Sequence, residues 1–167
     1  GHVNALLGQE GEGVFKEAAE KTILEDITRT LDRMQVKMDS FFNEQSLYEN
    51  KAIYDVVEKL NEKGLVYQKD GAVWFATSQL GKDKDTVLIK KSGEPTYRLP
   101  DIAYHRDKLD RGFDLCIDIF GADHIDTYPD VLRGIDVLGY DANKIDVLVY
   151  QFVTLVKDGK PYKMSTR

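Results

Sequence analysis

The sequence lacks the features by which several broad classes of protein are recognised. Cys116 is its single cysteine among 167 residues, which excludes an internal disulfide. No apolar run is long enough to cross a bilayer and no signal-peptide pattern is present, so neither a membrane protein nor a secreted one is indicated. The sequence also has no Cys/His cluster at zinc-ligand spacing, no glycine-rich phosphate loop and no spaced Ser/His/Asp set. Cys116 falls inside a strand pattern, which favours a buried thiol over a nucleophile.

The sequence has no surplus of basic residues either. The formal net charge is −6, which argues against a general nucleic-acid-binding surface. The charge is unevenly placed, however, because residues 157–167 hold four cations against one anion. This basic segment is either an exposed charged tail or a clamp for phosphate groups, and composition leaves both interpretations open.

The spacing of apolar residues predicts an α/β protein. Helices are predicted over residues 14–38, 51–63, 101–109 and 130–138, several of them ending at a glycine. Short β-type runs occupy residues 65–68, 72–75 and 86–89, and Asp70-Gly71 is a strong hairpin signal between the first two. Further strands at about residues 97, 115 and 147 alternate with helices, which predicts a parallel sheet with right-handed crossovers. Residues 65–95 then form a small antiparallel insertion.

The strand predicted from residue 113 has two distinct faces. Ile117 and Ile119 lie on one face, and Cys116 and Asp118 lie on the other. Asp118 is therefore expected to face outward from a strand that a parallel sheet would bury on both sides, or to lie near an edge of the sheet.

Polar residues at the ends of predicted strands are candidates for a site, because open α/β sheets bind ligands there. Asp101 follows Pro100 at the start of a helix, which favours an N-cap; the alternative is a carboxylate that holds a cationic ligand. His124 follows Gly-Ala-Asp and is either a satisfied histidine or a contact residue. Glu44 lies among aromatic residues in a loop, where a solvated or capping role is the usual one.

Several motifs taken together resemble the arginyl-tRNA synthetases, which are class I enzymes with a Rossmann catalytic domain. They are Glu-Pro-Thr-Tyr-Arg-Leu-Pro-Asp-Ile-Ala-Tyr-His, Gly-Ala-Asp-His, Lys-Met-Ser-Thr-Arg and, upstream, Asn-Glu-Gln-Ser-Leu-Tyr, and the similarity covers about residues 26–167. The fold class this implies is α/β: the second half of a Rossmann-type parallel sheet, with a small antiparallel β insertion and flanking helices. The implied domains are a helical segment (1–50), a connective insertion (51–95) and the second Rossmann half (96–167), which ends at a loop like the KMSKS signature.

The resemblance also implies an activity and a site. The reaction would join arginine to ATP, release pyrophosphate and pass the arginyl group to the 3′ end of a tRNA, in the cytoplasm, with Mg²⁺ bound through the phosphates. The residues that match the arginine pocket of the family are Glu44, Tyr97, Asp101 and His124. Those that match its ATP site are Gly121, Phe152, Val153, Lys163 and Met164, and the catalytic loop residues are Lys163, Ser165 and Arg167. No resident metal is implied.

Two departures from the family bear on activity. Thr166 stands where many class I enzymes have a second lysine, so Lys157, Lys163 or Arg167 would have to supply that charge. The first signature of the family, the His-x-Gly-His loop, is not in this sequence, and the sequence stops at the second. We therefore expect a piece of an enzyme, inactive alone. The rival interpretations are another class I nucleotidyl-transferring domain and a non-catalytic fold module.

Overall fold

The computed structural model describes residues 12–151 and 153–162, and the chain divides into two units, residues 1–42 and 43–167. The regular structure described in the first unit is one helix, α2 (Glu12–Arg33). This helix ends before residue 38, where the apolar spacing had placed its end. Gln35 adopts a left-handed backbone (φ 59°), and the Val36 N–H donates to the Leu31 carbonyl at 2.9 Å, which closes the helix.

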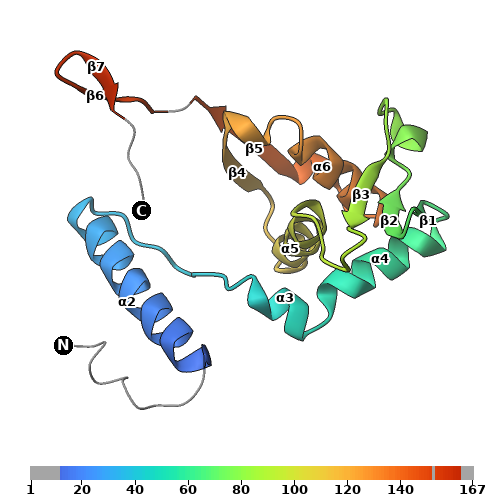
Figure 1. Cartoon of the computed structure of the whole chain (residues 1–167), viewed down its shortest axis with the longest axis horizontal. Coiled ribbons are helices and arrows are strands. Elements are labelled where there is room, and N and C mark those ends of the chain that lie inside the picture. The colour runs from blue at the N-terminus through green and yellow to red at the C-terminus, as the bar shows by residue number, and fades with distance from the viewer. Residues whose placement is uncertain (1–11, 152, 163–167) are drawn as a thin grey trace. The chain divides into compact units, whose positions relative to one another are not determined.

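The second unit carries the remaining elements (Figure 1). It starts with α3 (Gln45–Glu49) and α4 (Ala52–Glu62), followed by an antiparallel sheet of β1 (Val66–Lys69), β2 (Ala72–Phe75) and β3 (Thr86–Ile89), with the 3-10 turn η1 (Thr77–Leu80). After these come α5 (Arg98–Asp110), β4 (Cys116–Gly121), η2 (Ala122–His124), α6 (Tyr128–Val137), η3 (Ala142–Lys144), β5 (Ile145–Tyr150), β6 (Leu155–Lys157) and β7 (Lys160–Tyr162).

The antiparallel sheet confirms the short strands and the hairpin predicted from local signals. Asp70 and Gly71 both have positive φ, 54° and 78°, as a tight hairpin turn between β1 and β2 requires. The pairing runs from Val66 opposite Phe75 to Lys69 opposite Ala72. Gly64 ends α4 with φ 71°, and the Leu65 N–H returns to the Leu60 carbonyl at 3.1 Å.

The parallel pair is smaller than predicted. β4 and β5 pair in parallel from Cys116 opposite Ile145 to Gly121 opposite Tyr150, and α6 forms the connection between them. The strand predicted at about residue 97 is wrong, because Tyr97 is already helical (φ −54°, ψ −29°) and α5 begins at Arg98. Pro100 does not delay the helix, since the first turn has no intrahelical partner for the N–H that proline lacks.

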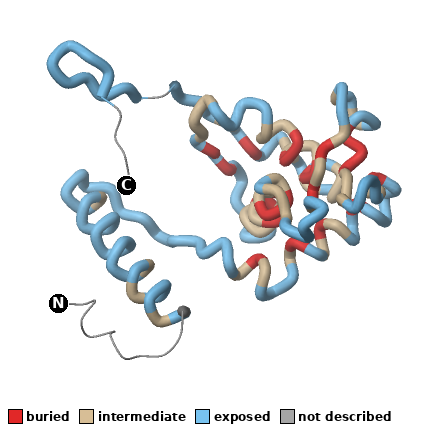
Figure 2. The backbone as a smooth tube through the Cα atoms, in the orientation of Figure 1, coloured by how far each residue is buried: buried red, intermediate tan, exposed pale blue. Residues whose placement is uncertain are grey.

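The two faces of β4 are oriented opposite to the prediction, which had Asp118 facing outward. Asp118 points inward and is 9% exposed, whereas Ile117 and Ile119 are 57% and 67% exposed. The reason lies in α5, whose His105 and Lys108 both bond to the Asp118 carboxylate. Cys116 shares the inner face and is buried, as its strand pattern predicted. The open face of β4 is therefore the apolar one. Buried and exposed residues alternate along the first part of this strand (Figure 2).

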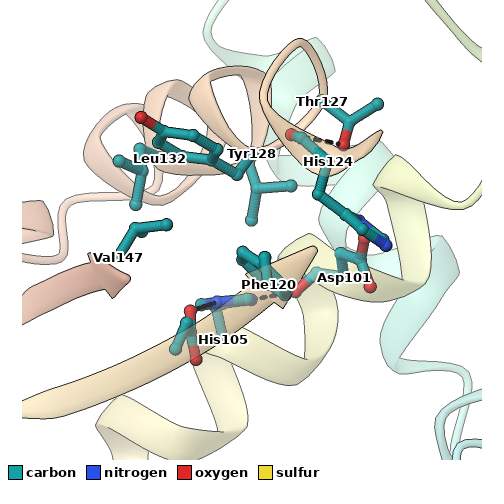
Figure 3. A pocket seen from close by; sticks show the side chains of 10 residues that line it. Asp101, His105, Phe120, His124, Thr127, Tyr128, Leu132 and Val147 are labelled. Atoms are coloured by element: carbon teal, nitrogen blue, oxygen red, sulfur yellow. Dashed lines mark hydrogen bonds and ion pairs between the residues drawn. The ribbon is translucent and has the colours of Figure 1, made fainter. Parts of the chain in front are cut away.

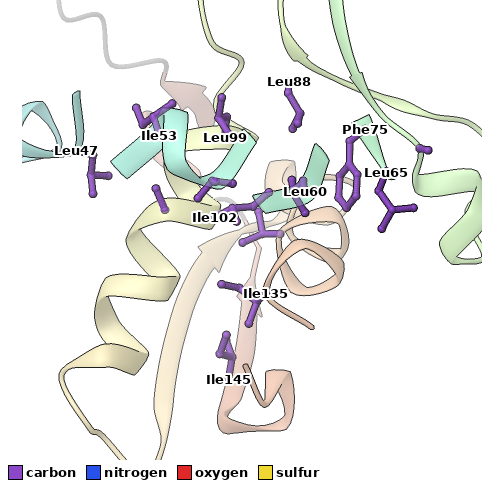
Figure 4. Close-up of a cluster of buried hydrophobic side chains, with 14 of the residues drawn as sticks. Leu47, Ile53, Leu60, Leu65, Phe75, Leu88, Leu99, Ile102, Ile135 and Ile145 are labelled. Atoms are coloured by element: carbon purple, nitrogen blue, oxygen red, sulfur yellow. The ribbon is translucent and has the colours of Figure 1, made fainter. Parts of the chain in front are cut away.

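The core of the second unit forms around α5. Leu99 and Ile102 of this helix are fully buried, and they meet Ile53 and Leu60 of α4 and Ile135 of α6 (Figure 4). α5 and α6 approach closely at Gly134, where an added Cβ would lie 2.7 Å from the Ile102 Cδ1 atom. The core thus fixes the axis of α5, the helix that carries Tyr97 and Asp101 at its beginning.

A buried carboxylate joins the antiparallel sheet to these helices. Asp130, at the start of α6, has a side chain that is 1% exposed. Its Oδ2 atom accepts from Lys82 Nζ at 2.6 Å, from Thr86 Oγ1 at 3.0 Å and from Arg98 Nε at 2.9 Å. Arg133 Nη1 lies 3.5 Å from Oδ1. We call these five residues the Asp130 clamp; they connect β3 and the loop before it to α5 and α6.

Candidate ligand site at the carboxyl end of the parallel strands

An open cleft of about 900 Å³ lies beside the first turn of α5. Its lining comes from α3, from the connection between β3 and α5, from α5 itself and from η2 and the residues after it, and it includes Tyr97, Asp101 and His124. β4 leads directly into η2, so the cleft lies at the carboxyl end of a parallel strand, where ligands of open α/β sheets are expected. We call it the binding cleft.

Asp101 is the most distinctive residue of the binding cleft. It lies within the first turn of α5, whose N-cap is Tyr97, so the N-cap interpretation of Asp101 is wrong. No described residue donates a hydrogen bond to its carboxylate. Burial raises the pKa of Asp101, and the negative charge of Glu44 raises it further, while the charges of His105, His124 and Lys108 act in the opposite direction. Asp101 is thus a partly desolvated carboxyl group whose oxygen atoms accept no hydrogen bond from the described residues.

The basic side chains that line the binding cleft already have carboxylate neighbours. Lys90 pairs with Glu94 at 3.4 Å. Arg98 is held by Asp130, and His124 lies 3.9 Å from Asp123. Among the described residues, Asp101 is therefore left with a negative charge that faces the cleft and no cation bonded to it. A cationic ligand group would complete this arrangement.

The other residues that match the arginine pocket lie around Asp101. His124 stacks on Phe120 with ring centroids 5.1 Å apart and is half exposed at the end of η2. Tyr97 is 89% exposed, so its ring is free to cover a ligand. Glu44 is the N-cap residue of α3, but its side chain makes no capping hydrogen bond. Its charge acts on Asp101 and on Tyr48, whose pKa is raised by burial and then by Glu44. Tyr97, Asp101 and His124 share the cleft, and Glu44 acts on it electrostatically.

The residues that match the ATP site are only partly within the described chain. Gly121 ends β4, and an added Cβ there would lie 2.5 Å from the Asp123 Oδ1 atom, so a larger residue would displace the exposed Asp123 side chain. Val153 is 82% exposed. Neither residue lines the binding cleft. Phe152, Lys163, Met164, Ser165 and Arg167 lie outside the described residues. The basic segment begins as the β6–β7 hairpin, with Asp158 and Gly159 at positive φ, although no hairpin was predicted there.

Sequence reasoning missed a buried polar group next to Asp101. His105 lies one turn further along α5, and its Nδ1 atom is 2.7 Å from the Asp101 carbonyl oxygen. Its Nε2 atom bonds to Asp118, whose other carboxylate oxygen accepts from Lys108 at 2.5 Å. Figure 3 shows Asp101, His105 and His124 around a small second pocket. The apolar spacing had placed His105 in the stripe formed with Ile102 and Leu109; the signal to notice was the polar Asp118 in the following strand.

Membrane-spanning helices and metal-binding clusters are both absent from the described residues. No helix in residues 12–151 and 153–162 is both long and apolar enough to span a bilayer. Over the same residues, no group of three or more His, Cys, Asp or Glu side chains is arranged to hold a metal ion.

The comparisons with known proteins agree with one another. The family model described as "tRNA synthetases class I (R), catalytic domain" matches residues 3–167. The arginine–tRNA ligase of Desulfotalea psychrophila is 63% identical over 92% of this chain, and that of Salinibacter ruber is 51% identical over 99%. The chain spans only 28% and 30% of the length of these two relatives.

Solved structures show the same relationship. A crystal structure from Campylobacter jejuni that was assigned as an arginyl-tRNA synthetase matches 92% of this chain and 34% of its own, with a TM-score of 0.77 and 38% identity. The arginyl-tRNA synthetase of Plasmodium falciparum, at 14% identity, shares the fold over 90% of this chain and 27% of its own, with a TM-score of 0.69. The fold is thus that of the class I aminoacyl-tRNA synthetase catalytic domains. Within that class, the chain belongs to the arginine family, "tRNA synthetases class I (R)".

Proposed function

We propose that this chain is the arginine-binding part of an arginine–tRNA ligase. The ligase would act in two steps. A carboxylate oxygen of arginine attacks the α-phosphorus of ATP, and the bond to pyrophosphate breaks; the 3′-terminal ribose of the tRNA then takes the arginyl group and AMP leaves. The observation that carries the proposal is Asp101, a partly buried carboxylate in the binding cleft whose cationic partner is not supplied by the described chain.

The chemistry of arginine fits this cleft. A guanidinium is always charged and presents five N–H donors in a rigid planar fork, which carboxylates accept in pairs. Asp101 and Glu44 supply the negative charge, and the exposed ring of Tyr97 covers the aliphatic stem of the ligand. His124 serves as a hydrogen-bonding group, because adenylate formation depends on alignment and charge stabilisation rather than on proton transfer by the protein.

The remaining parts of the assignment rest on the match to the family. Gly121, Phe152, Val153 and Met164 would meet ATP. Lys163, Ser165 and Arg167 would stabilise the charge that develops on pyrophosphate, and Mg²⁺ would be held by the phosphates of ATP. The tRNA would bind mainly through parts of the longer relatives that this chain does not span. A cytoplasmic location stays a prediction.

Titration calorimetry of the chain with L-arginine and with L-citrulline tests the pocket. Citrulline keeps the shape of arginine but has no charge, so a cleft that recognises charge through Asp101 binds arginine and ignores citrulline. Equal binding of the two would contradict the proposed recognition. If neither binds, the pocket is not preformed in this chain. Substitution of Asp101 in the full-length ligase then decides whether this residue recognises arginine.

Substitution of Asp101 in the full-length ligase provides that decision. Asp101→Asn is expected to cost about 2–5 kcal/mol in the selection of arginine, measured as KM in ATP–pyrophosphate exchange, because a buried charge partner is lost. Asp107→Asn is the matched control: it lies on the same helix and pairs with Arg111 at 3.2 Å on the surface. An unchanged arginine dependence in Asp101→Asn would refute the assignment.

A further inference from the structure

Three buried charged side chains form a group next to Asp101 that no step of the proposed reaction uses. His105 and Asp118 are 5% and 9% exposed, and the side chain of Lys108 is 13% exposed. α5 supplies the two basic members, and β4 supplies the carboxylate. This His105–Lys108–Asp118 group reaches Asp101 through the hydrogen bond between the His105 ring and the Asp101 carbonyl.

The hydrogen bonds determine the charge of His105. The Asp101 carbonyl can only accept a hydrogen bond, so the Nδ1 atom of His105 carries a hydrogen. The Nε2 atom faces Asp118. Burial, the strongest influence, raises the pKa of Asp118, but hydrogen bonds from His105 and Lys108 outweigh it and bring the pKa below its usual range. The other oxygen of Asp118 already accepts from the Lys108 ammonium, as a carboxylate does, so Oδ2 is the acceptor for Nε2. Because both ring nitrogens donate, His105 is an imidazolium.

The group consequently carries one net positive charge. His105 and Lys108 contribute two cations, and Asp118 contributes one anion. Asp101 lies within the reach of this field, and it needs such a charge because it is partly desolvated and has Glu44, a like charge, close by. Desolvation and a neighbouring carboxylate both disfavour ionisation, whereas a fixed cation favours it.

We infer that His105 is a positioning residue: held as an imidazolium by Asp118, it fixes the Asp101 turn of α5 and keeps the Asp101 carboxylate ionised for a guanidinium ligand. The inference rests on the proposed arginine site and adds a residue to it.

The other charged and titratable groups around Asp101 come from several elements. They are Glu44 and Tyr48 at α3, Lys90 and Glu94 before α5, Arg98 on α5, and Asp123 and His124 on η2. Lys90, Arg98 and His124 have carboxylate partners of their own. Among the cations that act on Asp101, His105 alone is bonded to its backbone, so its removal is expected to have the largest effect.

The first measurement is ¹⁵N NMR of histidine-labelled chain, in which the three histidines are assigned by substitution. At neutral pH, both ring nitrogens of His105 are expected to show the shifts of a protonated imidazolium. In Asp118→Asn, the amide NH₂ can donate to Nε2, so the ring is expected to become neutral with its hydrogen on Nδ1. A neutral His105 ring in the unsubstituted chain would overturn the inference, whether or not arginine binds.

The second measurement follows the Asp101 carboxyl carbon as the pH is changed. In His105→Gln, the Asp101 titration is expected to move to higher pH, because the amide preserves a hydrogen bond but removes the charge. Asp118→Asn is the second variant, since it tests the same group if the glutamine protein does not fold. In Asp118→Asn the Lys108 ammonium remains and is no longer paired, so the Asp101 titration is expected to move less than in His105→Gln. An Asp101 titration unchanged in His105→Gln would contradict the inference.

The third measurement links the group to the substrate in the full-length ligase. The ratio of the KM for arginine at about pH 5.5 to that at about pH 7.5 is expected to be higher in His105→Gln than in the unsubstituted ligase, because more Asp101 is protonated at the lower pH. Asp107→Asn is expected to leave this ratio unchanged. If KM rises by the same factor at both pH values in His105→Gln, His105 has a structural role only, and the inference is overturned. Failure of the unsubstituted ligase to select arginine would instead refute the proposed function, while the two NMR results would still stand.

Discussion

Replacement of Asp130 tests whether one buried carboxylate ties the antiparallel insertion to the helices. Asp130→Ala removes three hydrogen bonds of 2.6–3.0 Å from a side chain that is 1% exposed. It also leaves Lys82, Arg98 and Arg133 close together without their anion. Removal of one partner from a buried ion pair costs about 3–5 kcal/mol. The three cations are 28–29% exposed and can turn toward water, so we expect a loss of about 2–4 kcal/mol in the free energy of unfolding.

The assay is urea unfolding followed by two probes. Trp74, the single tryptophan, lies in β2 of the insertion, so its fluorescence reports on that sheet. Circular dichroism at the helical band reports on the helices. With a urea m-value of about 2 kcal/mol per M, the midpoint is expected to fall by about 1–2 M. Because the clamp joins the sheet to α5 and α6, the Trp74 transition is also expected to come earlier than the helical one.

The matched control is Asp107→Asn, which removes an exposed ion pair with Arg111 on α5. Exposed pairs contribute about 0–1 kcal/mol, so this midpoint is expected to stay within a few tenths of 1 M. The reasoning is refuted if Asp130→Ala shifts the midpoint no more than Asp107→Asn does. Coincident transitions with a large shift would show that Asp130 stabilises the whole unit rather than the attachment of the sheet.

Three further predictions concern packing, pH and the open sheet face. Gly134→Ala is expected to cost about 1–3 kcal/mol in thermal unfolding, because the added Cβ meets Ile102 at 2.7 Å, whereas Gly13→Ala, with nothing within 4 Å, should be neutral or stabilising by up to about 1 kcal/mol. The pKa of Asp118 is lowered by folding, so its stabilising contribution is complete above the ordinary aspartate pKa and is lost as the pH falls through the lower folded value. Urea midpoints measured from neutral pH into that acid range should therefore fall less steeply in Asp118→Asn, and an equal slope would contradict this. Ile119→Thr, at a side chain 67% exposed, should change the free energy of unfolding by at most about 0.5 kcal/mol and reduce self-association in light scattering; a larger loss would mean that this face is covered.

Local signals made much of the fold predictable. The Asp70-Gly71 turn, the Gly64 helix end and the short β runs depend on neighbouring residues only, and all three were confirmed. The same turn chemistry at Asp158-Gly159 marked a second hairpin, so that element was predictable and was overlooked. The strand placed at residue 97 was wrong because the helix starts earlier than predicted: Tyr97 already has helical dihedral angles, and Pro100 fits the first helical turn.

Long-range contacts were the part that the sequence could not supply. The inward direction of Asp118 depends on His105 and Lys108, which lie in another element and turn a polar strand position into a buried one. Alternation along the strand identified the two faces but did not tell which of them meets α5. For the site, Tyr97, Asp101 and His124 came from matched motifs and share one cleft. His105 went unrecognised because its spacing also suits a core position.

The Asp130 clamp has a consequence for the order in which a ribosome produces this chain. Asp130 is made 48 positions after Lys82 and 32 positions after Arg98, two of the residues that it joins. At about 5–20 residues per second, the insertion waits about 2–10 s for its anchor. Its hairpin closes locally within microseconds, so the small sheet forms early and docks late. During that interval its attachment face, including the basic side chain of Lys82, is open to chaperones and to proteases.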